Sequence, residues 1–127
     1  MPSKFRASEH QEQKAVIDWW AVMCASYKLP EFALFAVPNA AKRSFVLAAM
    51  LKAEGMRAGI PDLILLAKCP RDPEAGCLLV EMKRKPNKPS PEQIVVIDYL
   101  RHAGYHCVIA WNAVEAIRAI EAYLKKP

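Results

Sequence analysis

Residues 59–85, GIPDLILLAKCPRDPEAGCLLVEMKRK, decide the fold of this chain. An apolar run at residues 62–67 opens with Asp62, directly after a turn-forming Gly-Ile-Pro. A second apolar run at residues 77–80 leads into Glu81. Short apolar runs bounded by turn residues are typical of buried β-strands. Because a loop rich in Pro, Asp and Gly joins the two runs, we expect them to form neighbouring strands.

Three charged side chains meet where these two strands pair. Side chains alternate faces along a strand, so Glu81 and Lys83 point the same way, while Met82 points into the opposite layer. Pairing of the strands brings Asp62 beside them. Carboxylate oxygens are hard ligands that suit Mg²⁺ or Mn²⁺, and a nearby lysine can position an attacking water or stabilise negative charge. The trio predicts metal-assisted phosphodiester hydrolysis; the alternative is a solvent-exposed strand end with an ordinary Glu–Lys surface pair.

Composition limits the class of protein. The chain has 127 residues, 54% of them hydrophobic, and a net charge of +5, which indicates a single soluble domain (residues 1–127) and is compatible with a polyanionic partner. Its four cysteines form no CxxC pair, and its three histidines are not at zinc-ligand spacing from them, which argues against a zinc site or a disulfide framework. Reduced core thiols, no signal peptide and no apolar run of membrane-spanning length predict a cytoplasmic protein without membrane contact.

The N-terminal segment predicts a helix with acidic residues in its first turns. Ser8 is a suitable N-cap, and Glu9, Glu12 and Gln13 follow it. The apolar residues at helical spacing are Ala15, Val16, Trp19, Trp20, Val22 and Met23. Two interpretations stay open for Glu9 and Glu12: favourable charge at a helix N-terminus, or a further carboxylate brought over the sheet to the metal. The two tryptophans are expected in the core, with base stacking as the alternative.

Periodicity and capping residues predict the remaining elements. They are a strand at 32–37, a helix at 44–54 closed by Gly55, a helix from Ser90 to Gly104, a strand at 105–110, and a helix from 112 or 113 to 124. The helix at 44–54 has one apolar face made by Val46, Leu47, Met50 and Leu51. In SPEQ (90–93), Ser90 is the N-cap, Pro91 takes the first helical position, and Gln93 completes a capping box. The order α, β, α, β, β, α, β, α predicts an α/β fold with helices against a mixed sheet.

Basic residues gather on both sides of the charged trio. Lys42, Arg43, Lys52 and Arg57 precede the Asp62 strand. Arg84, Lys85 and Lys88 follow Lys83 in a proline-broken loop. Such clusters are either solvated surface or contacts to nucleic-acid phosphates, and their position next to a candidate metal site favours phosphates.

Six ordered blocks of this chain resemble the VRR-NUC family, a branch of the PD-(D/E)XK nuclease superfamily. The blocks are PNAAKRS (38–44), LKAEG (51–55), GIPDL (59–63), VEMKR (80–84), SPEQ (90–93) and AGY (103–105). The likeness extends from Glu9 to Leu124. It implies a restriction-endonuclease-like fold, a mixed β-sheet flanked by helices around a PD-(D/E)XK core.

The resemblance also implies roles for individual residues. Asp62 and Glu81 would bind a divalent metal, Mg²⁺ or Mn²⁺, with help from the main-chain carbonyl of Met82, and Lys83 would be the catalytic lysine. The family has a glutamate on the N-terminal helix at the site; Glu9 resembles it, with Glu12 as the alternative. Gln93 is similar to a glutamine that faces the site, although its capping role explains it equally well.

These observations predict a metal-dependent endonuclease that cuts DNA phosphodiester bonds. Lys42, Arg43, Arg84, Lys85 and Lys88 would hold the DNA backbone. Stand-alone members resemble homodimeric resolvases that cut four-way (Holliday) junctions, which suggests a structure-selective enzyme of DNA repair in a bacterial or phage-infected cell. The main alternative is a non-catalytic DNA-binding or assembly module with a nuclease-like fold. Enzymes restricted to RNA or single strands, and hydrolases of small phosphate esters, are further alternatives.

Overall fold

The computed structural model describes residues 7–38 and 44–127 and contains the predicted order of helices and strands. The helices are α1 (Glu9–Met23), α2 (Phe45–Ala53), α3 (Pro91–His102) and α4 (Ala113–Leu124). The strands are β1 (Leu34–Ala36), β2 (Leu63–Leu65), β3 (Leu78–Met82) and β4 (His106–Ala110). Two 3₁₀ turns, η1 (Cys24–Tyr27) and η2 (Glu31–Ala33), connect α1 to β1. None of the helices within the described ranges is long and apolar enough to cross a membrane.

The four strands form one mixed sheet in the order β1-β2-β3-β4. The β1–β2 and β2–β3 pairs are antiparallel, with Leu63 opposite Val80, whereas β3 and β4 are parallel, with Met82 opposite Ala110. This arrangement confirms the predicted α/β fold. Because β2 runs away from Asp62 while β3 runs toward Glu81, the start of β2 and the end of β3 lie at the same end of the sheet.

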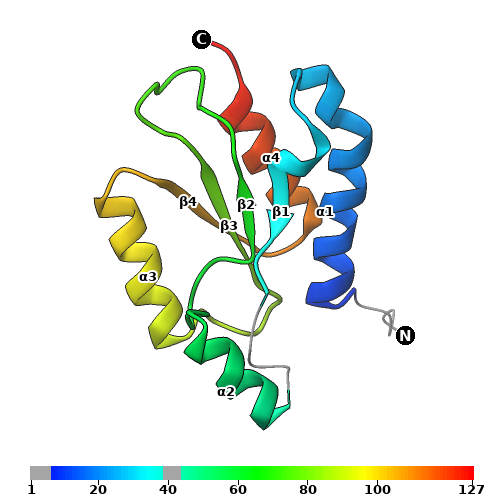
Figure 1. The fold of residues 1–127 in the computed structure, drawn as a ribbon. Helices are drawn as coiled ribbons and strands as arrows, with labels where there is room; N and C mark the ends of the chain where they lie inside the picture. The colour runs from blue at the N-terminus through cyan, green and yellow to red at the C-terminus, as the bar shows by residue number, and fades with distance from the viewer. Residues whose placement is uncertain (1–6, 39–43) are drawn as a thin grey trace.

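Helices cover both faces of the sheet (Figure 1). Helices α1 and α4 pack together on one face, over a core that includes Trp20, Leu63, Val80 and Ile120. Helix α3 covers β3 and β4 on the other face, where Ile97 packs with Leu79 and Cys107. The alternation of side chains along β3 therefore directs its odd-numbered residues toward the α3 face and its even-numbered residues toward α1 and α4.

Helix α1 buries a narrower face than its sequence predicts. Val16 and Trp20 are fully buried and Trp19 is partly buried against the core, which confirms the core interpretation of the tryptophans. Val22, however, is 78% exposed. The helix touches α4 and the sheet along a single stripe, so Val22 lies outside the contact although its spacing fits a broad apolar face.

The predicted strand at 32–37 is shorter in the structure. Glu31–Ala33 forms a 3₁₀ turn, and the strand begins only at Leu34. The indole of Trp20 donates a hydrogen bond of 2.9 Å to the carbonyl oxygen of Glu31. This contact holds the turn against α1, so a tertiary interaction overrides the β-propensity of Phe32.

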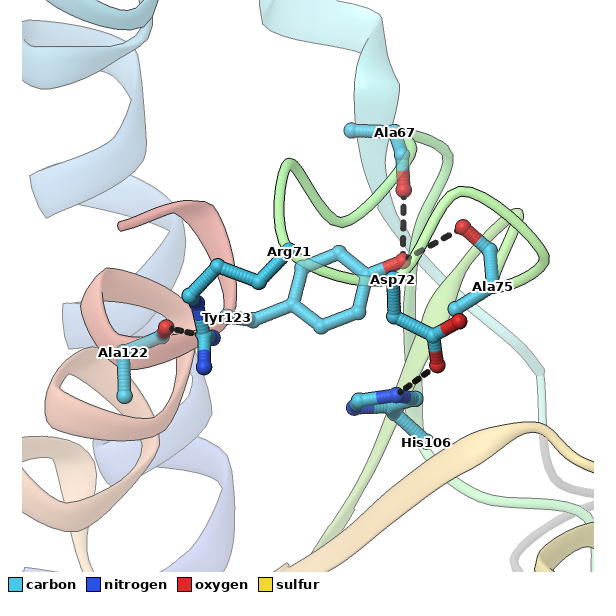
Figure 2. A network of polar contacts seen from close by, with 7 residues as sticks. All are labelled: Ala67, Arg71, Asp72, Ala75, His106, Ala122 and Tyr123. Carbon is cyan, nitrogen blue, oxygen red and sulfur yellow. Dashed lines mark hydrogen bonds and ion pairs between the residues drawn. The ribbon is translucent and has the colours of Figure 1, made fainter. Parts of the chain in front are cut away.

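The loop between β2 and β3 is fixed at the end of the sheet away from Asp62 and Glu81 (Figure 2). The Tyr123 hydroxyl donates to the carbonyl oxygen of Ala67 at 2.7 Å and also contacts that of Ala75. Asp72 pairs with His106 at 3.0 Å, and the Arg71 guanidinium donates to carbonyl oxygens at the end of α4. The loop is thus anchored to α4 and β4, which keeps the register of β2 and β3 defined.

Helix α2 differs from the other helices because none of its residues is buried. It leaves the sheet at the same end as Asp62 and Glu81 (Figure 1). Phe45 is 89% exposed and Met50 53% exposed. The apolar face expected for this segment exists, but none of its residues is buried in the core of the chain.

Candidate active site

A cleft of about 600 Å³ opens at the end of the sheet where β2 begins and β3 ends. It is lined by side chains from α1, the segment after β1, the start of β2, the end of β3 and the start of α3. These residues are Glu9, His10, Gln13, Ala36, Val37, Pro38, Asp62, Glu81, Lys83 and Gln93. The structure therefore brings together Asp62, Glu81 and Lys83, which are up to 21 positions apart in the sequence.

Asp62 is held in the cleft by the backbone of the neighbouring strand. Its Oδ2 accepts a hydrogen bond of 2.7 Å from the backbone N–H of Met82. Its own carbonyl oxygen accepts from the N–H of Val37 at 2.8 Å, so the ladder between β1 and β2 continues one step beyond the strand. The carboxylate is thus fixed to β3.

Glu81 is the only charged residue among the buried positions of the described ranges, with 1% of its surface exposed. Its Oε2 accepts a hydrogen bond of 3.0 Å from the side-chain amide of Gln93. Its Oε1 is buried and has no hydrogen-bond partner among the described residues. A buried carboxylate oxygen without a partner is costly, which indicates that a ligand belongs there.

The electrostatics of the two carboxylates reflect their burial and proximity. Burial, together with the charge of Asp62, raises the pKa of Glu81 to about 8. Burial also raises the pKa of Asp62, although the hydrogen bond from Met82 opposes this shift. The Lys83 ammonium lowers the pKa of both carboxyl groups. Two carboxylates that resist ionisation side by side form a site that favours a bound cation.

Met82 and Lys83 lie on opposite sides of β3, as their alternation predicts. The Met82 side chain is buried in the core under α1 and α4, whereas Lys83 lines the cleft with Glu81. The backbone N–H of Lys83 donates to the carbonyl oxygen of Ala110 at 2.9 Å, which extends the β3–β4 ladder past Met82. The backbone that carries the lysine is therefore held to the end of β4.

Glu9 and Glu12 point to different places. Glu9 lines the cleft with the two carboxylates, and its charge contributes to the raised pKa of both. Glu12 instead accepts a hydrogen bond of 3.3 Å from the backbone N–H of Ala113 and so caps the start of α4. The geometry places Glu9, and not Glu12, at the cleft.

Gln93 reaches Glu81 because α3 begins directly beside the start of β2. Its Oε1 accepts from the N–H of Ser90 at 2.8 Å, and Ser90 Oγ accepts from the N–H of Gln93, so the predicted capping box is confirmed. Its Nε2 is left to donate to Glu81.

Gly59, at φ +86°, lies against the Glu92 carbonyl, where a Cβ would come within 2.7 Å of the oxygen. The close approach requires glycine at this position.

Comparison with known proteins decides the family. The model of the VRR-NUC domain matches residues 7–112, most of the chain and all of the cleft. The chain belongs to the VRR-NUC family. A solved structure named "VRR_NUC domain protein" superposes with a TM-score of 0.75 at 25% sequence identity, covering 94% of this chain and 90% of that one. A search of curated proteins finds no match. VRR-NUC domains are nucleases, so membership implies a hydrolase with DNA as its substrate.

The basic residues predicted to hold DNA are only partly placed in this VRR-NUC domain. Arg84 and Lys85 line a second cavity next to the cleft. Lys88 is exposed in the loop before α3. Lys42 and Arg43 lie outside the described residues.

Several residues that line these cavities, among them His10, Gln13 and Trp111, are missing from the sequence-based prediction of the site. His10 and Gln13 line the cleft, and Trp111 lines the second cavity. Gln13 lies one helical turn after Glu9, so helical spacing is a signal that could have identified it once Glu9 was chosen. Trp111 has no such signal, because it follows a strand and precedes a helix.

The residues of the VRR-NUC cleft fit a divalent metal ion. In residues 7–38 and 44–127, no group of three or more His, Cys, Asp and Glu side chains is gathered closely enough to hold a metal by itself. Asp62 and Glu81 offer two carboxylates with raised pKa values and one unpartnered buried oxygen. Mg²⁺ and Mn²⁺ are commonly bound by one or two carboxylates together with water and substrate phosphate, and this donor set matches that requirement.

Proposed function

We propose that this VRR-NUC domain is a Mg²⁺- or Mn²⁺-dependent endonuclease that hydrolyses phosphodiester bonds of DNA, acting as one domain. The observation that carries the proposal is the unpartnered Oε1 of Glu81, buried beside Asp62 and Lys83 in one cleft. A surface Glu–Lys pair would be solvated, whereas Glu81 is 1% exposed. Burial of this kind is a feature of ligand sites and not of strand ends.

In this proposal the chain supplies the ligands and the charge for the reaction. Asp62 and Glu81 hold the ion, with the main-chain carbonyl of Met82 as a further ligand. Such an ion, when bound, lowers the pKa of a water and offsets charge on the phosphate. Lys83 directs its ammonium into the cleft, where it positions the attacking water and stabilises the extra negative charge of the transition state.

Two other residues support the carboxylates. Gln93 donates to Oε2 of Glu81 at 3.0 Å, which fixes the carboxylate and leaves Oε1 for the ion. Glu9 adds a third carboxylate at the edge of the cleft, supported by its contribution to the pKa of Glu81. A carboxylate at that position can bind a water of the hydrated ion or accept a proton from the attacking water.

The DNA backbone would be held by Lys42, Arg43, Arg84, Lys85 and Lys88. The positions of Arg84 and Lys85 next to the cleft support this role for two of them. Contacts of this kind release counterions, so affinity should fall steeply as salt rises. Contacts to phosphates do not read the bases, which favours recognition of DNA shape, such as a four-way junction or a flap. We propose that the protein is such an enzyme of DNA repair, acting in the cytoplasm.

We propose further that the enzyme acts as a homodimer and that α2 forms the contact. The exposed residues Phe45, Val46, Leu47 and Met50 support this surface. A helix of nine residues is marginal in water without tertiary packing, and α2 buries none of its side chains in its own chain. Two copies would present two clefts, which paired cutting of a junction requires.

A substrate panel tests the proposed function. Purified protein would be incubated with Mg²⁺, Mn²⁺ or EDTA and with duplex, flap, four-way junction, single-stranded DNA and RNA. We expect cutting of DNA only with metal, and loss of cutting in Lys83→Ala. Binding of DNA without any cutting by the wild-type protein would reject the enzyme in favour of a DNA-binding module. If the protein cuts only RNA or small phosphate esters, DNA is rejected as its substrate.

A further inference from the structure

A second cavity of about 310 Å³ adjoins the cleft and is not used by the proposed mechanism. It lies between the N-terminal ends of α1 and α4, beyond the end of β3. Its lining residues are Ala7, Glu12, Arg84, Lys85, Trp111, Asn112 and Glu115. Its volume is at the lower end of the range for small-molecule pockets.

The backbone joins this cavity directly to the cleft. Lys83, which lines the cleft, is followed by Arg84, which lines the cavity. The backbone N–H of Lys83 donates to the carbonyl oxygen of Ala110 at 2.9 Å, and Trp111 is the next residue. The cleft and the cavity are therefore joined through consecutive residues at the ends of β3 and β4.

The chemistry of the cavity suits a nucleotide. Trp111 is partly exposed, and the Lys85 ammonium lies 6.0 Å from its ring centroid, at the outer limit of a cation–π contact. Neither the Lys85 ammonium nor the Arg84 guanidinium is in an ion pair with another described residue, so both can contact a phosphate. An aromatic ring beside two cations is the arrangement that binds single-stranded nucleic acid, because every base can stack on the ring.

The two carboxylates in the lining are both held by backbone N–H groups at the start of α4. Glu115 Oε1 accepts from the backbone N–H of Trp111 at 3.1 Å, and Glu12 Oε2 accepts from that of Ala113 at 3.3 Å. Both charges are thus engaged by the start of α4, where the helix dipole favours them. Together they fix the backbone that carries Trp111.

We propose that this cavity binds an unpaired nucleotide of the substrate, with its base on Trp111 and its phosphate on Arg84 and Lys85. The inference rests on the proposed function only in taking DNA as the ligand. A base inside a duplex is already stacked and cannot enter a cavity, so the site selects an unpaired segment next to the scissile phosphate. Flaps and junctions offer such segments.

Binding measured without cutting tests this inference. A fluorescein-labelled oligothymidylate and a matched duplex would be titrated in EDTA by fluorescence anisotropy. Trp111→Ala is expected to weaken binding of the oligothymidylate about tenfold, the loss of one base–aromatic stack, and to leave duplex binding nearly unchanged. Trp111→Phe keeps a ring and should retain binding, while losing the quenching of tryptophan fluorescence that a stacked base causes.

Two controls keep the result interpretable. Tyr99→Ala removes an exposed aromatic side chain of α3 outside the cavity and should change neither affinity. Thermal melting of each variant shows whether it folds. The inference is overturned if Trp111→Ala binds the oligothymidylate as tightly as the wild type does, or if its affinities for the oligothymidylate and for the duplex fall by the same factor. If the wild type binds the oligothymidylate through Trp111 but does not cut DNA, the proposed nuclease activity is rejected and this site is kept. If the wild type cuts DNA but its binding does not depend on Trp111, this site is rejected and the nuclease activity is kept.

Discussion

The side-chain amide of Gln93 donates a hydrogen bond of 3.0 Å to Oε2 of Glu81, which ties the first turn of α3 to the end of β3. The same side chain closes the capping box of α3 through its Oε1. One residue therefore stabilises a helix and orients a buried carboxylate. A substitution that keeps the first role and removes the second can separate them.

Gln93→Glu is that substitution. Glutamate keeps the oxygen that accepts from Ser90, but it replaces the donor to Glu81 with a second negative charge. We expect DNA cleavage to fall by at least about tenfold, since a hydrogen bond to a charged group contributes about 1.5–3 kcal/mol. Cleavage rates of purified variants give the measurement.

Gln11→Glu is the matched control, because Ser8 and Gln11 form the same capping box at α1 and do not line the cleft. Its cleavage rate should stay within about twofold of wild type, as for most surface substitutions. Equal activity of Gln93→Glu and wild type would show that Gln93 serves the helix alone.

Glu9 and Glu12 should affect different properties. Glu9→Gln is expected to lower cleavage without lowering the melting temperature, because Glu9 lines the cleft and holds no backbone group of the described residues. Glu12→Ala is expected to lower the free energy of unfolding by about 1 kcal/mol, because it removes a partner of the α4 N-terminus. Thermal melting and cleavage assays on both variants measure the two effects; loss of stability in Glu9→Gln would contradict the assignment.

The stability of the metal-free protein should fall as pH rises from 5 to 8. The pKa of Glu81 is about 8 in the folded chain, above its ordinary value of 4.5, so the folded state binds more protons than the unfolded state across this window. Each pH unit in the window costs up to about 1.4 kcal/mol. Melting curves in EDTA test this: wild type should lose stability as pH rises, and Glu81→Gln should show a flatter profile. If the stability of the wild type and of Glu81→Gln changes with pH in the same way, the raised pKa of Glu81 is contradicted.

The apolar face of α2 should control the oligomeric state. Phe45→Asp places a charge at the first position of α2, which the helix tolerates while the surface loses its largest apolar side chain. We expect the mass measured by light scattering to change from that of a dimer to that of a monomer. Val114→Asp makes the same change in the first turn of α4 at a 53% exposed residue and should leave the mass unchanged. A monomeric wild type would reject the dimer.

Much of this fold follows from local sequence patterns. The runs at 62–67 and 77–80, the capping residues Ser8 and Ser90, and the alternation at Glu81 and Lys83 depend on neighbours close in the chain, so the elements and the grouping of the trio were predictable. The strand at 32–37 is wrong at Phe32 and Ala33, because a contact with Trp20 holds these residues in a turn, and it ends one residue early, at Ala36. The strand predicted at 62–67 is limited to Leu63–Leu65. Periodicity likewise predicts the apolar face of α2 but not what covers it.

The parts of the site that sequence left open depend on contacts between distant residues. Glu12 is held by Ala113, which lies 101 positions after it, whereas Glu9 lines the cleft. The bond from Gln93 to Glu81 requires α3 to approach Gly59, and Trp111 joins Arg84 and Lys85 only through the parallel pairing of β3 and β4. Such contacts are set by the tertiary packing, which a single sequence does not specify.

Binding of Mn²⁺ to the DNA-free protein tests most directly whether Asp62 and Glu81 together hold a divalent ion. Isothermal titration calorimetry of the wild type and of Asp62→Asn, at pH 8, is the measurement. The asparagine keeps an oxygen that can accept from Met82, so the fold should be preserved. We expect Mn²⁺ to bind the wild type and its affinity to fall at least about tenfold in the variant, because a charged ligand becomes neutral. Equal affinity of the two proteins, or no binding by either, would contradict it.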